Sequence, residues 1–422
     1  MLKNHPKGLR VLFFTEMWER FGFYILMAVF VLYMDKEFGW DDSRKGNLYG
    51  FFLGAVYIFP VLGGWIGDKL LGHKRTIRIG AGLMFCGYSA LAFSSLDHLL
   101  LFYIGLVLVS VGTGIFKVNM SVSVGNLYAA GDPSKDAGFN IYYMGVNLGA
   151  AIAPVAATII HNVYGSYRAS FGAAAAGMLV SMVIFESGKN RLAEQHRTDD
   201  AHNGGTSAAD DPAEDRVRIQ TLIILFLIVI FFWIAFYQNG FALTLFAERS
   251  TVASDILKPE TYQFFNPFFI LVLTPPLISL FSRLRTKGKE PSSALKIFLG
   301  MFVSGFAMLI MVFAAHAGGD LDRNIMSPVW LISSYFVVTI AEILVSPMGQ
   351  SFVSKVAPRK IQGLMMGLWF AGTAVGSYGS GLIGRYYSAF AHHEYFLIIA
   401  VLLFFSSLLV LLFLKRLKRF AP

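Results

Sequence analysis

The sequence predicts an all-α membrane protein with twelve transmembrane helices arranged in two six-helix halves. Three observations support this fold class. First, 55% of the 422 residues are hydrophobic and only 14% are charged, whereas about a quarter of the residues in an ordinary soluble domain are charged. Second, apolar runs of about 20 residues recur along the chain, long enough to cross roughly 30 Å of hydrocarbon as helices. Third, one polar segment divides these runs into six and six.

The apolar runs set the bounds of the predicted spans. The first run follows a short basic segment and has no small-residue cleavage site, so we interpret it as a retained span and not as a signal peptide. We predict spans at residues 10–34, 47–68, 76–95, 98–120, 139–161, 168–186, 217–246, 262–282, 293–315, 328–353, 362–387 and 394–415.

The polar segment lies between the sixth and seventh spans, at residues 188–215. It includes RTDDAHNGGTSAADDPAED and has no apolar face. Such a stretch cannot bury enough surface to order itself, which is typical of a flexible linker. We therefore predict an N-terminal half at residues 1–187, a flexible cytoplasmic linker at residues 188–216 and a C-terminal half at residues 217–422.

The distribution of basic residues predicts the orientation of the chain. With both termini on the inner side, 25 of the 35 Lys and Arg residues fall in inner segments and eight in outer ones, in accordance with the positive-inside rule. We therefore expect both termini in the cytoplasm and a location in the plasma (inner) membrane. The net charge of +9 arises from these loops, and no aromatic-interleaved basic patch indicates binding of nucleic acid.

The two halves resemble each other at one junction. Spans two and three are joined by GGWIGDKLLGHKRTIR (Gly63–Arg78), and the equivalent junction of the second half is SRLRTKGKEPSSALK (Ser282–Lys296). Parallel repeats of this kind are typical of major facilitator transporters, and the first junction resembles the cytoplasmic loop motif of that superfamily. We expect Asp68, Lys74 and Arg75 to form a closely packed, charged turn with a gating role. The alternative is a basic loop that only fixes the topology.

Ionisable residues inside the spans are the strongest functional signal, because each costs roughly 2.5–3.5 kcal/mol on an insertion scale unless it is paired or hydrated. Span one contains Glu16, Glu19 and Arg20, whose spacing places them on one helical face. Span four contains Lys117, and span ten contains Glu342 five residues before a proline that should loosen the helix. The alternatives are a static ion-pair network in span one and snorkelling of Lys117 to the surface.

Other polar and aromatic side chains in the spans could line a cavity, although interfacial aromatics and amides that join helices are common. These residues are Tyr24, Tyr57, Tyr142, Tyr143, Asn147, Asn266 and Trp369. Signatures of other classes are missing: there is no GxxxxGK[ST] motif, no His/Cys metal spacing and no nucleophile elbow. The single cysteine, Cys86, excludes an intramolecular disulfide. We therefore expect no enzyme, no metal and no cofactor.

Six segments, in consistent order, resemble the proton-dependent oligopeptide transporters of the major facilitator superfamily. They are HPKGLRVLFFT and EMWERF around span one, GTGIFKVNMS in span four, FNIYYMGVNLGAAIAP in span five, FFNPFFILVLTPP in span eight and AEILVSPMGQSFVSKVAP in span ten. Three features depart from the family pattern. Phe23 and Tyr24 replace the usual tyrosine pair, span seven offers Tyr237 and Gln238 in place of an acidic residue, and no extra helices separate the halves.

The resemblance implies import of di- and tripeptides with protons as the coupling ion, by alternating access in a protein that functions as a monomer. It implies proton coupling by Glu16, Glu19, Arg20 and Lys117. The substrate-binding set that we expect is Arg20, Tyr24, Tyr57, Lys117, Asn147, Gln238, Asn266, Glu342 and Trp369. Within it, the two asparagines would bond the peptide backbone and Glu342 would bind the peptide ammonium.

A charge count supports this mechanism. The two glutamates of span one balance Arg20 and Lys117, so an entering peptide carboxylate requires one bound proton to restore neutrality. Two other readings stay open: a major facilitator transporter of another small substrate (nitrate, a drug or an amino acid conjugate), and a peptide sensor that does not transport.

Overall fold

The structure is a computed structural model, and it describes residues 5–129, 134–192, 212–252, 254–358, 361–413 and 417. These residues are helical almost throughout, and among them the only β contact is an isolated bridge between Thr251 and Met326. The N-terminal half contains α1 (Lys7–Lys36), α2 (Asp42–Ile66), α3 (His73–Ala92), α4 (Leu99–Gly125), α5 (Lys135–Tyr164) and α6 (Tyr167–Gly188). The C-terminal half contains α7 (Pro212–Phe236), α8 (Ala242–Arg249), α9 (Phe265–Thr286), α10 (Ser293–Ala317), α11 (Pro328–Val356), α12 (Gln362–Gly384) and α13 (His392–Leu412).

The predicted fold class is confirmed, because every predicted span corresponds to helix. Ten helical segments of the described chain are long and apolar enough to cross a membrane. The other two spans are α3 and α12, helices of 20 and 23 residues. The first turn of α3 is basic, and α12 is rich in glycine, so both have a lower hydropathy than their neighbours.

The seventh span differs from the prediction of one continuous helix at 217–246. It consists of α7, a short 3₁₀ segment (Tyr237–Gly240) and α8, and the chain changes direction at Phe241, where φ is −122° and ψ is −84°. A second 3₁₀ segment, Pro259–Phe264, leads into α9. Interrupted helices in transporters place backbone groups beside a binding site. In contrast, α11 continues through Pro347 and does not end there.

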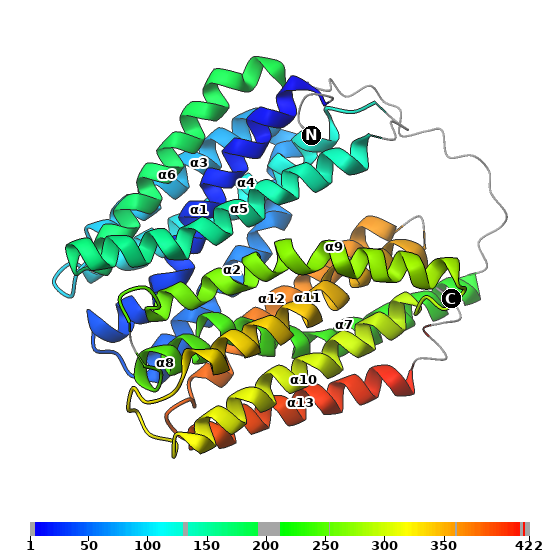
Figure 1. The fold of residues 1–422 in the computed structure, drawn as a ribbon. Coiled ribbons are helices and arrows are strands. Elements are labelled where there is room, and N and C mark those ends of the chain that lie inside the picture. Colours follow the sequence, from blue (N-terminus) through cyan, green and yellow to red (C-terminus); the bar gives the residue numbers. More distant parts are fainter. Residues whose placement is uncertain are drawn as a thin grey trace.

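The halves lie side by side, as Figure 1 shows. We call the end where α1 begins and α13 ends the terminal end, and the end where α1 ends and α13 begins the opposite end. The halves come together at the opposite end, near α8, and diverge toward the terminal end (Figure 1).

A network of charged side chains joins the halves at the opposite end. Arg249 of α8 binds Asp42 of α2 with both terminal nitrogens, at 3.0 and 3.3 Å, and its Nη2 also donates to Asp35 at 2.9 Å. Lys45 of α2 forms ion pairs with the same two aspartates. The two cations therefore compensate two carboxylates, and bidentate binding of a carboxylate by an arginine fixes the geometry of the contact.

Close helix packing strengthens the same end. A Cβ added to Gly46 of α2 would lie 2.5 Å from the carbonyl oxygen of Gly381 of α12, and one added to Gly381 would lie 2.4 Å from the nitrogen of Gly50. The absence of side chains at these positions therefore allows α2 and α12 to touch through their backbones. Thr158 of α5 also bonds Thr261 across the halves, at 2.6 Å.

The turn between α2 and α3 packs closely, as expected, but its charges are arranged differently. A Cβ on Gly67 would lie 1.8 Å from Oδ1 of Asn119, and Asn119 donates to the carbonyl of Gly63 at 2.8 Å. Asp68, however, is 61% exposed, and Arg75 is exposed. Asp68 therefore does not pack inside the turn: its carboxylate lies 3.7 Å from His73, and His73 in turn makes a part-buried polar contact with Asn119 (2.7 Å). The gating role of the turn stays a prediction.

The central linker falls largely outside the described residues, which omit 193–211. On its N-terminal side, α6 reaches Gly188 and a single 3₁₀ turn follows at Lys189–Arg191. On its C-terminal side, α7 begins at Pro212, five residues before the predicted start of the span.

Candidate functional site: a charged cavity between the halves

A cavity of about 250 Å³ lies between the two halves and takes its walls from both. It includes eight of the nine predicted substrate-binding residues: Arg20, Tyr24, Tyr57, Lys117, Asn147, Asn266, Glu342 and Trp369. The first five belong to the N-terminal half and the last three to the C-terminal half, so any ligand in this cavity contacts both units.

The positive wall of the cavity is formed by Arg20, which is held from behind by two glutamates of its own helix. Nη2 of Arg20 donates to Glu19 at 2.6 Å, its Nε also bonds that carboxylate, and Nε lies 3.4 Å from Glu16. All three side chains are at most 4% exposed. Glu16 and Glu19 do not line the cavity themselves, and Oε2 of Glu16 has no hydrogen-bond partner among the described residues. One buried carboxylate oxygen is thus available for a proton.

Lys117 of α4 completes this wall. Its ammonium lies 5.8 Å from the ring centroid of Tyr57 and makes no ion pair among the described residues. It interacts electrostatically with Arg20, Glu16 and Glu19 without touching them. A ligand anion would therefore meet an unpaired ammonium, and the aromatic face contributes a modest attraction to that cation.

The negative wall is Glu342 of α11, with no cationic partner in the part of the chain that the structure describes. Nδ2 of Asn266 on α9 donates to Oε2 of Glu342 at 2.8 Å and lies 3.2 Å from Oγ1 of Thr339. A carboxylate held by one neutral amide keeps most of its charge for a ligand. An ammonium group is the ligand that such a carboxylate binds best.

Aromatic rings surround these charges. Tyr57 packs on Tyr237 with centroids 5.6 Å apart, and Trp369 packs on Phe226 at 6.0 Å. Trp369 reaches this position because Gly349 has no side chain: a Cβ there would lie 2.0 Å from the indole ring. Such walls bind side chains of many shapes, since apolar contacts demand little polar matching.

One predicted residue, Gln238, is placed differently from the expectation. Gln238 lies outside the cavity, where its amide donates to Oγ and to the carbonyl of Ser380 (both 3.1 Å) and accepts a bond of 2.8 Å from Tyr395. It therefore joins the broken seventh span to α12 and α13. Asn147 does line the cavity, with its amide donating to the carbonyl of Tyr143 at 2.9 Å.

Several residues that line the cavity were not in the predicted substrate-binding set. They are Trp233, Phe236, Tyr237, Gln263, Tyr335, Ser346, Gln350 and Thr373. For Tyr237 a signal was present, since YQNG interrupts an apolar run at the break of the seventh span. The others are ordinary residues of apolar or mildly polar helices, and only packing shows that they face the cavity.

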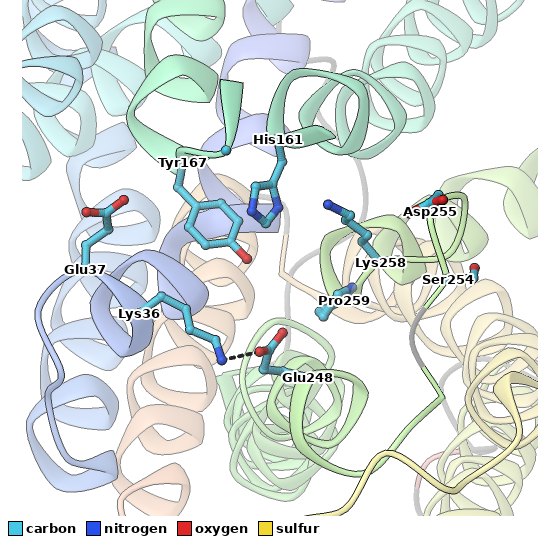
Figure 2. Close-up of a pocket in the computed structure, with 10 residues that line it drawn as sticks. Lys36, Glu37, His161, Tyr167, Glu248, Ser254, Asp255, Lys258 and Pro259 are labelled. Carbon is cyan, nitrogen blue, oxygen red and sulfur yellow. Dashed lines mark ion pairs between the residues drawn. The ribbon is translucent and has the colours of Figure 1, made fainter. Parts of the chain in front are cut away.

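A second, larger pocket of about 550 Å³ lies at the opposite end. Figure 2 shows its charged rim, in which Lys36 pairs with Glu248 across the halves and His161 lies beside Tyr167, with ring centroids 4.2 Å apart. Because none of the predicted site residues reaches this pocket, we assign the functional site to the central cavity.

Comparison with known proteins places the chain in a family. The model of the POT family matches residues 74–207 and 202–398. The chain belongs to the POT family. Peptide transporter YePEPT of Yersinia enterocolitica is 29% identical over 92% of this chain and 89% of its own length. Dipeptide and tripeptide permease A of Salmonella typhimurium is 30% identical over 91% of this chain and 84% of its own length.

Solved structures of POT family transporters agree with this fold. A crystal structure of peptide transporter POT in complex with sulfate has a TM-score of 0.89 at 28% identity and covers all of this chain and 97% of that one. A crystal structure of a mutant of peptide transporter POT in complex with alafosfalin has the same TM-score at 27% identity, with the same coverage of both chains. The fold of this POT family member is therefore that of the solved POT transporters, and the predicted family resemblance is confirmed.

Proposed function

We propose that this chain is a proton-coupled symporter that imports di- and tripeptides by alternating access. The observation that carries the proposal is the placement of charges of opposite sign on the two halves: Lys117 with Arg20 on one wall of the cavity and Glu342 on the other. A zwitterionic peptide is complementary to such a pair of walls. A dipeptide or tripeptide extends over roughly 3.3–3.6 Å per residue, and its backbone amides can bond to Asn147.

The charge balance of the N-terminal half supplies the coupling. Glu16 and Glu19 carry two negative charges, and Arg20 and Lys117 carry two positive ones, so the resting cluster is neutral. A peptide carboxylate adds one negative charge, and an uncompensated buried ion costs several kcal/mol. Protonation of one glutamate restores neutrality. Peptide and proton therefore enter together, with no other cofactor.

The relatives support peptides over the alternative substrates. Their names are those of peptide transporters and of dipeptide and tripeptide permeases, and a solved relative was crystallised with alafosfalin. A transporter family also argues against an enzyme.

We further propose that the protein functions as a monomer in the plasma (inner) membrane, with the terminal end in the cytoplasm. The bias of basic residues supports this orientation. The joined opposite end then faces outward, and the structure corresponds to a state closed to the outside.

Uptake by reconstituted protein tests this function. Proteoliposomes should accumulate labelled dialanine when the lumen is alkaline, and should show exchange without accumulation when no gradient is imposed. Counterflow assays with nitrate, drugs or amino acid conjugates in place of dialanine test whether the protein transports one of these substrates instead. Binding of dialanine without counterflow would identify a sensor and contradict transport.

A further inference from the structure

Three side chains with metal-ligating atoms meet at the opposite end, and none of them lines the central cavity or the pocket of Figure 2. They are His316 in the last turn of α10, Asp320 in the following turn and His393 in the first turn of α13. One ligand atom of each residue lies within 4.8 Å of the others. His316 is exposed and the other two are half-buried, so solvent and ions reach the cluster. Transport as proposed above uses none of them.

The backbone fixes the position of Asp320. The end of α10 forms a Schellman motif, in which the amide of Gly319 donates to the carbonyl of His316 and the amide of Asp320 donates to that of Ala315, both at 3.0 Å. Gly319 has a φ of +68°, which suits glycine at this position. Asp320 follows with a φ of +56°, and it is the only described residue other than glycine with a positive φ. The structure thus holds this aspartate in a conformation that costs energy.

The carboxylate of Asp320 is oriented by α13. Oδ1 accepts the backbone N–H of His393 at 2.8 Å, and Oδ2 lies 2.5 Å from Nδ1 of the same histidine. The rings of His316 and His393 are 5.5 Å apart between centroids and meet at 72°. Capping of α13 explains the first of these contacts. Capping of α13 does not require His316, which lies in the last turn of α10.

Two imidazoles and one carboxylate form a donor set typical of zinc, with bonds of about 2.0–2.2 Å and a fourth position left for water. Magnesium and calcium prefer all-oxygen sites. The ligand atoms lie within 4.8 Å of one another, which is wider than in a loaded tetrahedral site, so binding of an ion requires these side chains to move closer together.

We propose that His316, Asp320 and His393 bind a zinc-like divalent cation at the opposite end of this transporter. Such an ion fastens the end of α10 to the start of α13. It also restrains the turn between α10 and α11, which bonds α8: the amide of Met326 donates to the carbonyl of Ser250 at 2.8 Å, next to Arg249 of the charged network. A bound ion would therefore restrain a segment that contacts α8 beside Arg249, where the two halves are joined. Because imidazoles bind metal only when neutral, acid weakens the site.

Titration calorimetry on the purified full-length protein, with any affinity tag removed, tests the proposal. With ZnCl₂ at pH 7.5 we expect one ion per chain, weaker binding at pH 5.5 and no comparable binding of MgCl₂. His316→Gln should weaken zinc binding by more than about 100-fold, since loss of an orienting partner alone costs about 10–100-fold. His316 is exposed, so this variant should fold.

His98→Gln is the matched control, because His98 is an exposed histidine at the same end and outside the cluster. It should bind zinc as the wild type does. Asp320→Asn should also weaken binding, although it disturbs the cap of α13 as well. The absence of stoichiometric zinc binding by the wild type, or equal affinity in His316→Gln, would show that the cluster is only a helix cap. Neither result depends on which substrate the protein transports.

Discussion

Nδ2 of Asn266 donates a hydrogen bond of 2.8 Å to Oε2 of Glu342 and so joins α9 to α11 at the negative wall of the cavity. The asparagine was expected to bond the peptide backbone, yet its amide N–H is already in use. Its role in this state is to position the carboxylate. Glu342 keeps a second carboxylate oxygen for a ligand, which makes it the residue on which recognition of a peptide amino terminus depends.

Glu342→Gln should weaken peptide binding by about 10- to 100-fold, because a hydrogen bond to a charged group contributes ~1.5–3 kcal/mol. The shape of the side chain and its bond with Asn266 are largely kept, so the folded protein should persist. Binding of dialanine to purified protein measures the effect. Glu394→Gln, an exposed change at the start of α13, should leave affinity unchanged. Equal binding of N-acetylated dialanine by the wild type would rule out this role for Glu342.

Lys117→Ala should abolish gradient-driven accumulation while some peptide counterflow remains. Without the lysine the N-terminal cluster carries an excess negative charge, so a proton stays bound and no longer cycles with the peptide. Exchange needs no net proton cycle. Uptake into proteoliposomes with and without an inside-alkaline lumen separates the two activities, and Lys287→Ala, at an exposed lysine after α9, serves as control. Full accumulation by Lys117→Ala would mean that this lysine has no part in coupling.

Arg249→Gln should favour opening of the opposite end, by about tenfold or more. The substitution removes charge-assisted bonds to Asp35 and Asp42, each worth ~1.5–3 kcal/mol. Spin labels on cysteines at Arg168 and Val329, one on each half in a Cys86→Ser background, report the distance between the halves by electron paramagnetic resonance. The fraction of molecules with a longer distance between the labels should rise in Arg249→Gln. It should not rise in the control Arg283→Gln, which lies at the terminal end. An unchanged distance distribution in Arg249→Gln would show that the close glycine contacts between α2 and α12 keep the opposite end closed without the charged network.

Glu290, in the connection between α9 and α10, should stabilise the protein only above strongly acid pH. Hydrogen bonds from Arg285 (2.5 Å) and Lys296 (2.6 Å) lower the pKa of its carboxyl from 4.5 to about 2. A lowered folded-state pKa gives stability that is complete above the unfolded pKa and is lost as the pH falls from about 4.5 to about 2. Thermal unfolding of wild type and Glu290→Gln should therefore differ at pH 7, by ~0–1 kcal/mol as for surface pairs. The difference should shrink at pH 3, and a constant difference would contradict this assignment.

Much of the architecture was predictable because it is encoded locally. A membrane span is specified by the length and hydropathy of one segment, so the twelve helices could be located without knowledge of their partners. The same applies to the charges of α1, α4 and α11: an ionisable group inside an apolar run stands out by its cost alone. Their gathering around one cavity agrees with the functional hypothesis drawn from the sequence.

What the sequence by itself determined was therefore the number of spans, the two halves and the ionisable residues of the site. Only the tertiary structure decided which neighbouring groups face the cavity. Gln238 and Tyr237 are adjacent in the chain, yet the glutamine bonds Ser380 and Tyr395 while the tyrosine lines the cavity. The break at Phe241, the exposure of Asp68 and the bond between Asn266 and Glu342 were decided in the same way. Each depends on which face of a helix packs against segments distant in sequence, and local composition does not specify that choice.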